Sequence, residues 1–220
     1  MGLNIADNLK TILHSLPEKV TLVAVSKTYP IEAILEAYNA GQRHFGENKV
    51  QEMIVKHEDL PKDIQWHLIG HLQKNKVKYI VPFIHLIHSV DSFDLLLEIE
   101  KRASNAGRII NCLLQVHIAK EESKFGMDEK ELNEVLEKMH LMKHTHVKGL
   151  MGMATNTDDL QVVKQEFIEL KSLFDQLSGK EIPNTSMETL SMGMSGDYQL
   201  AIECGSNCVR IGSSIFGKRK

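Results

Sequence analysis

Short apolar segments alternate with helical patterns along almost the whole chain, and this alternation constrains the fold more than any other feature. Several of the segments are rich in Val, Ile and Leu without polar alternation, as expected for strands covered on both faces. Parallel α/β proteins have this pattern. Eight segments are predicted to be strands: 21–25, 44–46, 65–69, 84–90, 111–118, 147–153, 189–192 and 208–211.

The intervening segments carry apolar residues at helical spacing. One helix is expected to start at Pro30 and to stop before Gly41, because proline suits a first helical position and glycine a helix end. Residues 160–177 carry a long apolar stripe. Asp128 and Glu131 have the spacing of a capping box. An extra helix is expected before the first strand, with an apolar face of Ile5, Leu9, Ile12 and Leu13.

Eight strands with intervening helices predict a single (β/α)8 TIM-type barrel with an extra N-terminal helix, spanning residues 1–220 as one domain. An open doubly wound sheet is the alternative, but no strand–GxGxxG–helix unit favours it. Ligands bind barrels at the carboxyl ends of the strands. The residues expected to converge there are Lys27, Asn48, Gly70, Asp91, Met153, Ser191 and the segment 210–212.

Composition limits the function classes. The chain has 220 residues, 42% of them hydrophobic, and a net charge of −3, so no nucleic-acid partner is expected. No apolar stretch is long enough to span a membrane, and the first residues do not have the pattern of a signal peptide. Three cysteines do not form a disulfide framework, which predicts a cytoplasmic location.

Lys27 ends the apolar segment that forms the first predicted strand. A lysine at a barrel mouth is placed for Schiff-base chemistry, because burial beside other cations lowers the pKa of the amine and makes it nucleophilic. The alternative is a solvated lysine, one of 26 basic residues. Position alone does not decide between the two.

Two segments near the C-terminus favour phosphate binding. Residues 191–196 and 210–214 combine glycines with hydroxyl groups directly after the last two predicted strands, where barrels often bind phosphate. The alternative is that these glycines only serve tight turns. A lysine and a phosphate site on one face predict a phosphorylated aldehyde, with pyridoxal 5'-phosphate as the leading candidate. A class I aldolase-like barrel acting on a sugar phosphate is the alternative.

The 11 histidines do not indicate a metal site in the sequence. His140, His144 and His146 are close in sequence, as are His85 and His88, but no set of Cys, His and carboxylate with metal-ligand spacing accompanies them. No metal is therefore expected.

Motifs in register from the first predicted strand to the last carry a family resemblance. They include Val-Ser-Lys-Thr at 25–28, Phe-Gly-Glu-Asn at 45–48, Glu-Ser-Lys at 122–124, Ser-Met-Gly-Met-Ser-Gly-Asp at 191–197 and Val-Arg-Ile-Gly at 209–212. Together they resemble the pyridoxal phosphate homeostasis proteins, the YggS-like, proline synthase co-transcribed family. That family is similar to the N-terminal barrel domain of alanine racemase.

The resemblance implies roles for individual residues. Lys27 would hold pyridoxal 5'-phosphate as a Schiff base, Asn48 would line the pocket near its ring, and Arg210 would face the pyridine nitrogen. Ser191, the backbone at Met192, Gly212 and Ser213 would hold the phosphate. The chain departs from the family pattern at His71 and His117, which puts the fine structure of the pocket in doubt but not cofactor binding.

The resemblance also implies a function in intracellular pyridoxal phosphate homeostasis without efficient catalysis. Whether the chain is an enzyme stays open, and a non-enzymatic role is favoured because no second domain supplies a second acid/base. The alternative is a single-domain amino-acid racemase that depends on pyridoxal phosphate. The expected partners are the cofactor and apoenzymes that use it, and the chain is expected to be a monomer.

Overall fold

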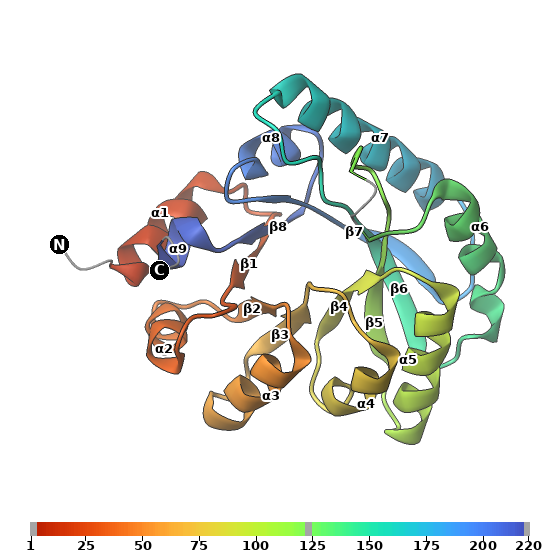
Figure 1. Cartoon of the computed structure of the whole chain (residues 1–220), viewed down its shortest axis with the longest axis horizontal. Coiled ribbons are helices and arrows are strands. Elements are labelled where there is room, and N and C mark those ends of the chain that lie inside the picture. Colours follow the sequence, from red (N-terminus) through yellow and green to blue (C-terminus); the bar gives the residue numbers. More distant parts are fainter. Residues whose placement is uncertain (1–3, 122–124, 218–220) are drawn as a thin grey trace.

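The computed structural model describes residues 4–121 and 125–217. Within these ranges, parallel strands form a closed ring in the order of the sequence, with helices around the outside (Figure 1). The last strand pairs with the first in a register that runs from Thr21↔Cys208 to Ala24↔Ile211. The predicted barrel is confirmed, and the open-sheet alternative is wrong because this pairing closes the ring.

Most strands begin or end within a few residues of their predicted bounds. The observed strands are β1 (Thr21–Val25), β2 (His44–Glu47), β3 (Gln65–Leu68), β4 (Leu86–Val90), β5 (Ile110–Gln115), β6 (Thr145–Met151), β7 (Thr185–Met194) and β8 (Cys208–Ile211). The largest difference is in β7, which is ten residues long against the four predicted. Its extra residues move the end of the strand toward the site, from Met192 to Met194.

The helices lie between consecutive strands, except α1, which precedes β1 as predicted, and α9, which follows β8. The α-helices are α1 (Ile5–Ser15), α2 (Ile31–Asn39), α3 (Val50–Asp59), α4 (Val77–Ile80), α5 (Phe93–Asn105), α6 (Glu129–Glu137), α7 (Leu160–Ser178), α8 (Tyr198–Glu203) and α9 (Ser213–Phe216). Two short 3₁₀-helices are η1 (Lys74–Lys76) and η2 (Met139–Leu141). In Figure 1, α1 and α9 pack side by side.

Local sequence signals set several helix ends. The capping box of Asp128 and Glu131 is present at the start of α6, as predicted. Pro30 is the N-cap of α2 in an extended conformation, so the helix begins at Ile31, one residue later than predicted. Gly41 follows α2 with a φ of 105°, a left-handed conformation that glycine adopts without strain.

Two apolar layers fill the molecule. The larger one lies between the barrel wall and the helices, and its largest fully buried side chains include Trp66, Phe45 and Phe167. A smaller apolar cluster of Leu86, Leu113 and Met151 fills one side of the barrel interior. On α1, the predicted apolar face is buried except for Leu13, whose exposed fraction is 40%. The barrel is therefore held mainly by the outer layer, which leaves part of its interior to polar groups.

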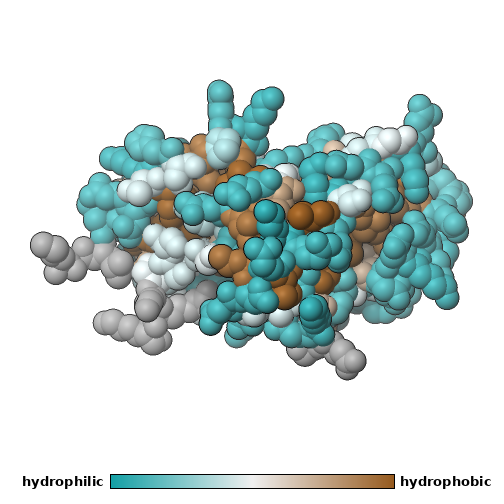
Figure 2. All heavy atoms as spheres, turned by 90° about the horizontal axis from the view of Figure 1, so that it is seen from above, coloured by the Kyte–Doolittle hydropathy of each residue, from teal (hydrophilic) through white to brown (hydrophobic). Residues whose placement is uncertain are grey.

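Hydrophilic residues cover most of the side of the molecule seen in Figure 2, and hydrophobic residues are visible between them near its middle. Among the helices of the described residues, none is both long and apolar enough to cross a membrane.

Candidate functional site

A cavity of about 440 Å³ opens at the carboxyl ends of the strands. Of the seven residues predicted to bind the cofactor, five line it: Lys27, Asn48, Arg210, Gly212 and Ser213. The rest of the wall is formed by Val25, Ile69, Met153, Met194, Ser195 and Gly196. Sequence reasoning placed Met153 at a strand end on this face and Met194, Ser195 and Gly196 in a segment predicted to bind phosphate, but it did not assign Val25 and Ile69 to the site. The sequence signal that could have identified Val25 and Ile69 is their position at the ends of the predicted strands 21–25 and 65–69.

Lys27 occupies a tight turn directly after β1. The backbone N–H of Tyr29 donates to the Ser26 carbonyl oxygen at 3.1 Å and closes the turn. Thr28, at the third position, has a φ of 69°, a conformation that glycine normally fills and that strains a β-branched residue. Strain of this kind persists only where the surroundings fix the backbone, and it often marks functional sites. The turn directs Lys27 onto the cavity.

A buried charged cluster fixes this turn from behind. The Lys56 ammonium donates to the Ser26 carbonyl oxygen at 2.8 Å, to Glu47 Oε1 at 2.7 Å and to Glu52 Oε1 at 2.6 Å. Glu52 Oε1 also accepts the backbone N–H of Thr28, and Glu47 Oε1 accepts the Ser26 hydroxyl at 2.6 Å. We call Glu47, Glu52 and Lys56 the turn-anchoring cluster. Its members secure the residues on both sides of Lys27.

Glu47 is the more deeply buried carboxyl group of the turn-anchoring cluster. Glu47 is completely buried, and burial raises the pKa of its carboxyl, although Lys56 and Ser26 oppose the shift. Its second oxygen, Oε2, has no hydrogen-bond partner among the described residues. Lys56 is the cation that compensates this buried carboxyl, so removal of Lys56 would leave a charge that the surroundings stabilise poorly.

Asn48 reaches the cavity because a glycine lies beside it. A Cβ atom at Gly70 would come within 2.6 Å of the Asn48 carbonyl oxygen and 2.8 Å of its Cα. Only glycine therefore lets the segment after β3 pass this close to the segment after β2. The side chain of Asn48 is partly exposed and offers an amide to a ligand.

The loops after β7 and β8 meet at the cavity and contain small residues. Ser195 Oγ accepts the backbone N–H of Gly212 at 3.1 Å, which joins the two loops. Asp197 Oδ1 accepts the backbone N–H of Met194 at 2.5 Å and orders the first loop. Barrels commonly bind phosphate with these two loops, where small residues allow close approach to backbone N–H groups.

Arg210 brings a buried positive charge to the cavity. Its exposed fraction is 4%, and its Nη1 donates to the Ser191 carbonyl oxygen at 2.9 Å and to Ser191 Oγ at 2.5 Å. Nη2 donates to the Gly152 carbonyl oxygen at 3.0 Å. All these acceptors are neutral. Burial lowers the pKa of Arg210, but the guanidinium stays charged at neutral pH because the ordinary pKa of arginine is above about 12.

Ser191 and Met192 are placed differently from the sequence prediction. Because β7 continues to Met194, both residues lie within the barrel wall and are fully buried. The hydroxyl of Ser191 contacts Arg210 and His88, and Met192 packs in the main core. Neither lines the cavity, whereas Ser195 and Gly196, which follow the observed end of the strand, do.

A column of hydrogen-bonded histidines extends from Ser191 through the barrel interior. His88 Nδ1 lies 3.0 Å from Ser191 Oγ, and His88 Nε2 lies 2.8 Å from His67 Nδ1. His67 Nε2 in turn lies 2.9 Å from His44 Nδ1. We call His44, His67 and His88 the histidine column. Burial, reinforced by the neighbouring histidines and, for His88, by Arg210, holds the pKa of His67 and of His88 well below the ordinary value, so both are neutral near pH 7.

His71 and His117, where the chain departs from the family pattern, lie outside the cavity lining. His71 Nδ1 is 3.0 Å from Asp91 Oδ2, and its ring stacks on Phe125 with centroids 4.2 Å apart. His117 Nε2 is 3.0 Å from the Glu121 carbonyl oxygen. Both contacts order loops near the barrel mouth. The motif at 122–124 falls outside the described residues.

The arrangement suits a phosphorylated carbonyl compound. An amine, a buried guanidinium and two loops of small residues face one space, so the cavity can attract an anion and offers a nucleophile close to it. Among the described lining residues, Lys27 and Arg210 are the ionisable ones.

Residues 3–220 match the family model of the alanine racemase N-terminal domain. The fold and the cavity thus define a barrel of the alanine racemase N-terminal class. The pyridoxal phosphate homeostasis protein of Helicobacter pylori is 44% identical over 90% of this chain and 87% of its own length. That of Pasteurella multocida is 37% identical over 98% and 96%. The chain belongs to the pyridoxal phosphate homeostasis protein family.

Solved structures agree with this assignment. PipY of Synechococcus elongatus, solved with PLP bound, is 38% identical and superimposes with a TM-score of 0.89 over 97% of this chain and 100% of that one. Its structure without PLP gives a TM-score of 0.91. Alanine racemase from E. faecalis has 16% identity and a TM-score of 0.79 over 99% of this chain and 58% of that chain, which shows a shared fold alone.

Proposed function

We propose that this protein binds pyridoxal 5'-phosphate in the cavity, holds it covalently on Lys27 and takes part in intracellular pyridoxal phosphate homeostasis. The observation that carries the proposal is the convergence of Lys27, Arg210 and the loops after β7 and β8 on one cavity. The relative PipY, solved with PLP bound, supports the same ligand. The free cysteines Cys112, Cys204 and Cys208 support a reducing, cytoplasmic location.

The residues present fit this cofactor. Ser195, Gly196, Gly212 and Ser213 would hold the phosphate, and the charges of Lys27 and Arg210 complement it. When bound, the cofactor supplies an aldehyde carbon, to which the Lys27 ε-amino nitrogen bonds with loss of one water molecule.

The surroundings favour holding the cofactor over using it. The family resemblance assigns Arg210 to the pyridine nitrogen, and a guanidinium there keeps that nitrogen unprotonated and weakens the ring as an electron sink. Proton transfer at an amino acid also needs an acid and a base. Lys27 and Arg210 are the ionisable groups among the described lining residues, and a permanently charged guanidinium makes a poor base. Delivery of the cofactor to apoenzymes is the role we propose for the loaded protein.

Borohydride reduction tests the attachment. The protein is saturated with pyridoxal 5'-phosphate, reduced and digested, and the phosphopyridoxyl group is located by peptide mass analysis. We expect it on Lys27, and we expect Lys27→Ala to lose it while Lys49→Ala keeps it, because Lys49 is an exposed neighbour of the site. An unmodified Lys27 in saturated protein overturns the proposal.

Cofactor delivery is tested separately. The loaded protein and free cofactor, at equal concentration, are compared in the rate at which they activate an apoenzyme that uses pyridoxal phosphate. We expect transfer from the loaded protein in the presence of a trap that removes free cofactor. Complete suppression by the trap would contradict direct delivery without affecting the attachment to Lys27.

A further inference from the structure

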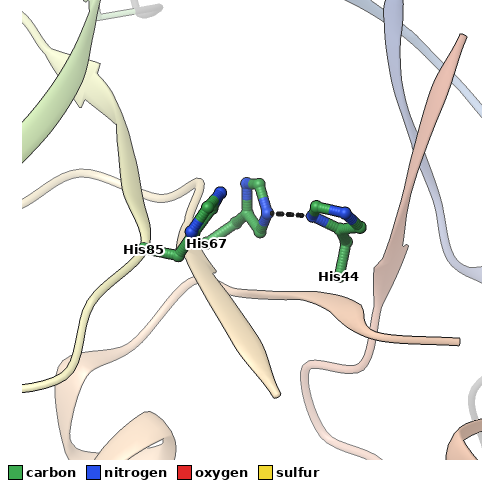
Figure 3. A group of neighbouring side chains, drawn as sticks. All are labelled: His44, His67 and His85. Carbon is green, nitrogen blue, oxygen red and sulfur yellow. Dashed lines mark hydrogen bonds between the residues drawn. The ribbon is translucent and has the colours of Figure 1, made fainter. Parts of the chain in front are cut away.

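Three histidines meet at the amino ends of neighbouring strands, opposite the cofactor cavity. His44 is the first residue of β2, His67 lies within β3, and His85 directly precedes β4. In Figure 3 the three rings lie next to one another, with a hydrogen bond between His44 and His67. Each can offer a ring nitrogen such that all three nitrogen atoms lie within 4.8 Å of one another.

A metal ion bound between the three rings would draw these nitrogen atoms closer together than this limit. Zinc–nitrogen distances of about 2.0–2.1 Å in a tetrahedral site place ligand nitrogens about 3.3 Å apart. The nitrogens of His44 and His67 are 2.9 Å apart and would need to separate by a few tenths of an ångström. His85 is exposed, so its ring can adjust to complete the set.

The surroundings of His67 match those of a metal ligand. A ligating histidine usually gives its second ring N–H to a fixed acceptor, which sets the orientation of the ring. The second nitrogen of His67, Nδ1, lies 2.8 Å from His88 Nε2, and His88 Nδ1 lies 3.0 Å from Ser191 Oγ. With His67 Nε2 on an ion, both N–H groups can donate along the histidine column. The column thus supplies the support that a buried ligand requires.

Charge and access are also compatible with an ion. Exposed His85 and partly buried His44 lie beside buried His67, so the cluster borders solvent. Arg108 is bound to the carbonyl oxygens of Val81 and Ile84, and its charge moderates the affinity for a second cation.

We propose that His44, His67 and His85 form a binding site for a divalent transition-metal ion of the zinc class, with a fourth position open to water. Three neutral imidazoles suit Zn²⁺, Co²⁺ and related ions rather than Mg²⁺ or Ca²⁺. Sequence spacing predicts no metal site because the ligands are far apart in the chain. Strand pairing in the barrel brings them together.

The test uses the full chain, free of any histidine tag and with or without cofactor. Zn²⁺ binding is measured by calorimetry, and Co²⁺ binding by visible absorption, which is intense for a four-coordinate ion. We expect one ion per chain and an intense Co²⁺ band. His85→Ala removes the exposed ligand without touching the histidine column, and we expect it to weaken Zn²⁺ binding at least tenfold and to remove the band.

His140→Ala is the matched control, because His140 is exposed and lies outside the cluster. We expect it to bind as the unmodified protein does. His44→Ala should lose the band as well; should it fail to fold, His85→Ala still decides the matter. Absence of Zn²⁺ binding, or unchanged Zn²⁺ affinity and Co²⁺ absorption in His85→Ala, overturns the proposal.

Discussion

At the scale of single residues, the position of Lys27 depends on side chains that do not line the cavity. The turn-anchoring cluster contacts Ser26 on one side of Lys27 and Thr28 on the other. Thr28 keeps its left-handed backbone because its N–H is held by Glu52. The cluster therefore ties the turn that carries Lys27 to α3, which contains both Glu52 and Lys56.

Replacement of the buried cation in this cluster should be costly. We expect Lys56→Met to lower the free energy of unfolding by about 3–5 kcal/mol, because it leaves the Glu47 carboxylate buried without its counter-charge. We also expect a higher cofactor concentration for half-saturation of Lys27, because the turn loses its anchor. Urea unfolding and a cofactor titration measure the two effects.

Two further variants give this prediction its controls. Lys49→Met, at the exposed position before α3, should change stability by less than about 0.5 kcal/mol. Adding Glu47→Gln to Lys56→Met should recover part of the loss, because it removes the uncompensated charge. Wild-type stability in Lys56→Met would show that the cluster does not secure the turn.

At the scale of elements, α5 holds the segment that leads into β6. Glu100 of α5 accepts the backbone N–H groups of Lys143 at 2.9 Å and of His144 at 2.9 and 3.0 Å. Burial raises the pKa of the Glu100 carboxyl, but these donors and the His144 side chain outweigh it, so the pKa lies below the ordinary value. The ionised carboxylate therefore fixes the start of β6 against the helix.

We expect Glu100→Gln to destabilise the protein by about 1.5–3 kcal/mol at pH 7, the usual contribution of hydrogen bonds to a charged group. A carboxyl whose pKa is lowered by folding stabilises the fold above its unfolded pKa, and this contribution falls as the pH drops below about 4.3. The difference from wild type should therefore shrink in acid. Unfolding midpoints in urea at pH 7 and near pH 4 measure it.

Glu98→Gln on the same helix is the matched control. Glu98 pairs with Arg102 one turn away, at 2.6 Å, in a partly buried position. A helical pair of this kind contributes about 0.3–0.5 kcal/mol. A pH-independent effect of Glu100→Gln, or an equal effect of the two variants, would contradict the role assigned to Glu100.

The strands also show which sequence patterns predict secondary structure and which do not. Strands buried on both faces were predictable where they are continuous apolar segments, as in β1. The first half of β7 was missed because it is polar and pairs through side chains: Lys148 with Glu188 at 3.2 Å, and His146 with Ser186 at 3.1 Å. The end of β7 was also predicted two residues too early, and this placed Ser191 and Met192 at the rim of the barrel instead of inside its wall.

At the scale of the whole molecule, the barrel could be predicted from the sequence. The apolar pattern of each strand and helix is a local property, and the alternation of these patterns repeats along the chain. The site followed less completely. Lys27 and Arg210 were singled out through their motifs, and both line the cavity. Ser195 and Gly196 belong to the predicted segment 191–196, but only the true end of β7 separates them from buried Ser191 and Met192. The histidine column could not be predicted, because its members come from three strands and meet only through their register in the barrel.

The small number of ionisable groups in the cavity lining predicts little turnover of amino acids. With Lys27 and Arg210 as the ionisable groups among its described lining residues, we expect no useful exchange of the α-hydrogen when the loaded protein is incubated with individual L-amino acids in deuterated water. Proton NMR follows the exchange, with Lys27→Ala as the control. Rapid exchange that depends on Lys27 would instead establish a racemase-type enzyme.

The hydrogen bonds of the histidine column must all run in the same direction along the barrel interior. A neutral imidazole has one N–H and one lone pair, so a row of them can be satisfied in only two ways, with every donor pointing toward Ser191 or every donor pointing away from it. One ring cannot reverse alone without leaving two donors, or two lone pairs, face to face. Whatever orients the His44 ring at the amino ends of the strands therefore also orients the proton that Ser191 presents beside Arg210.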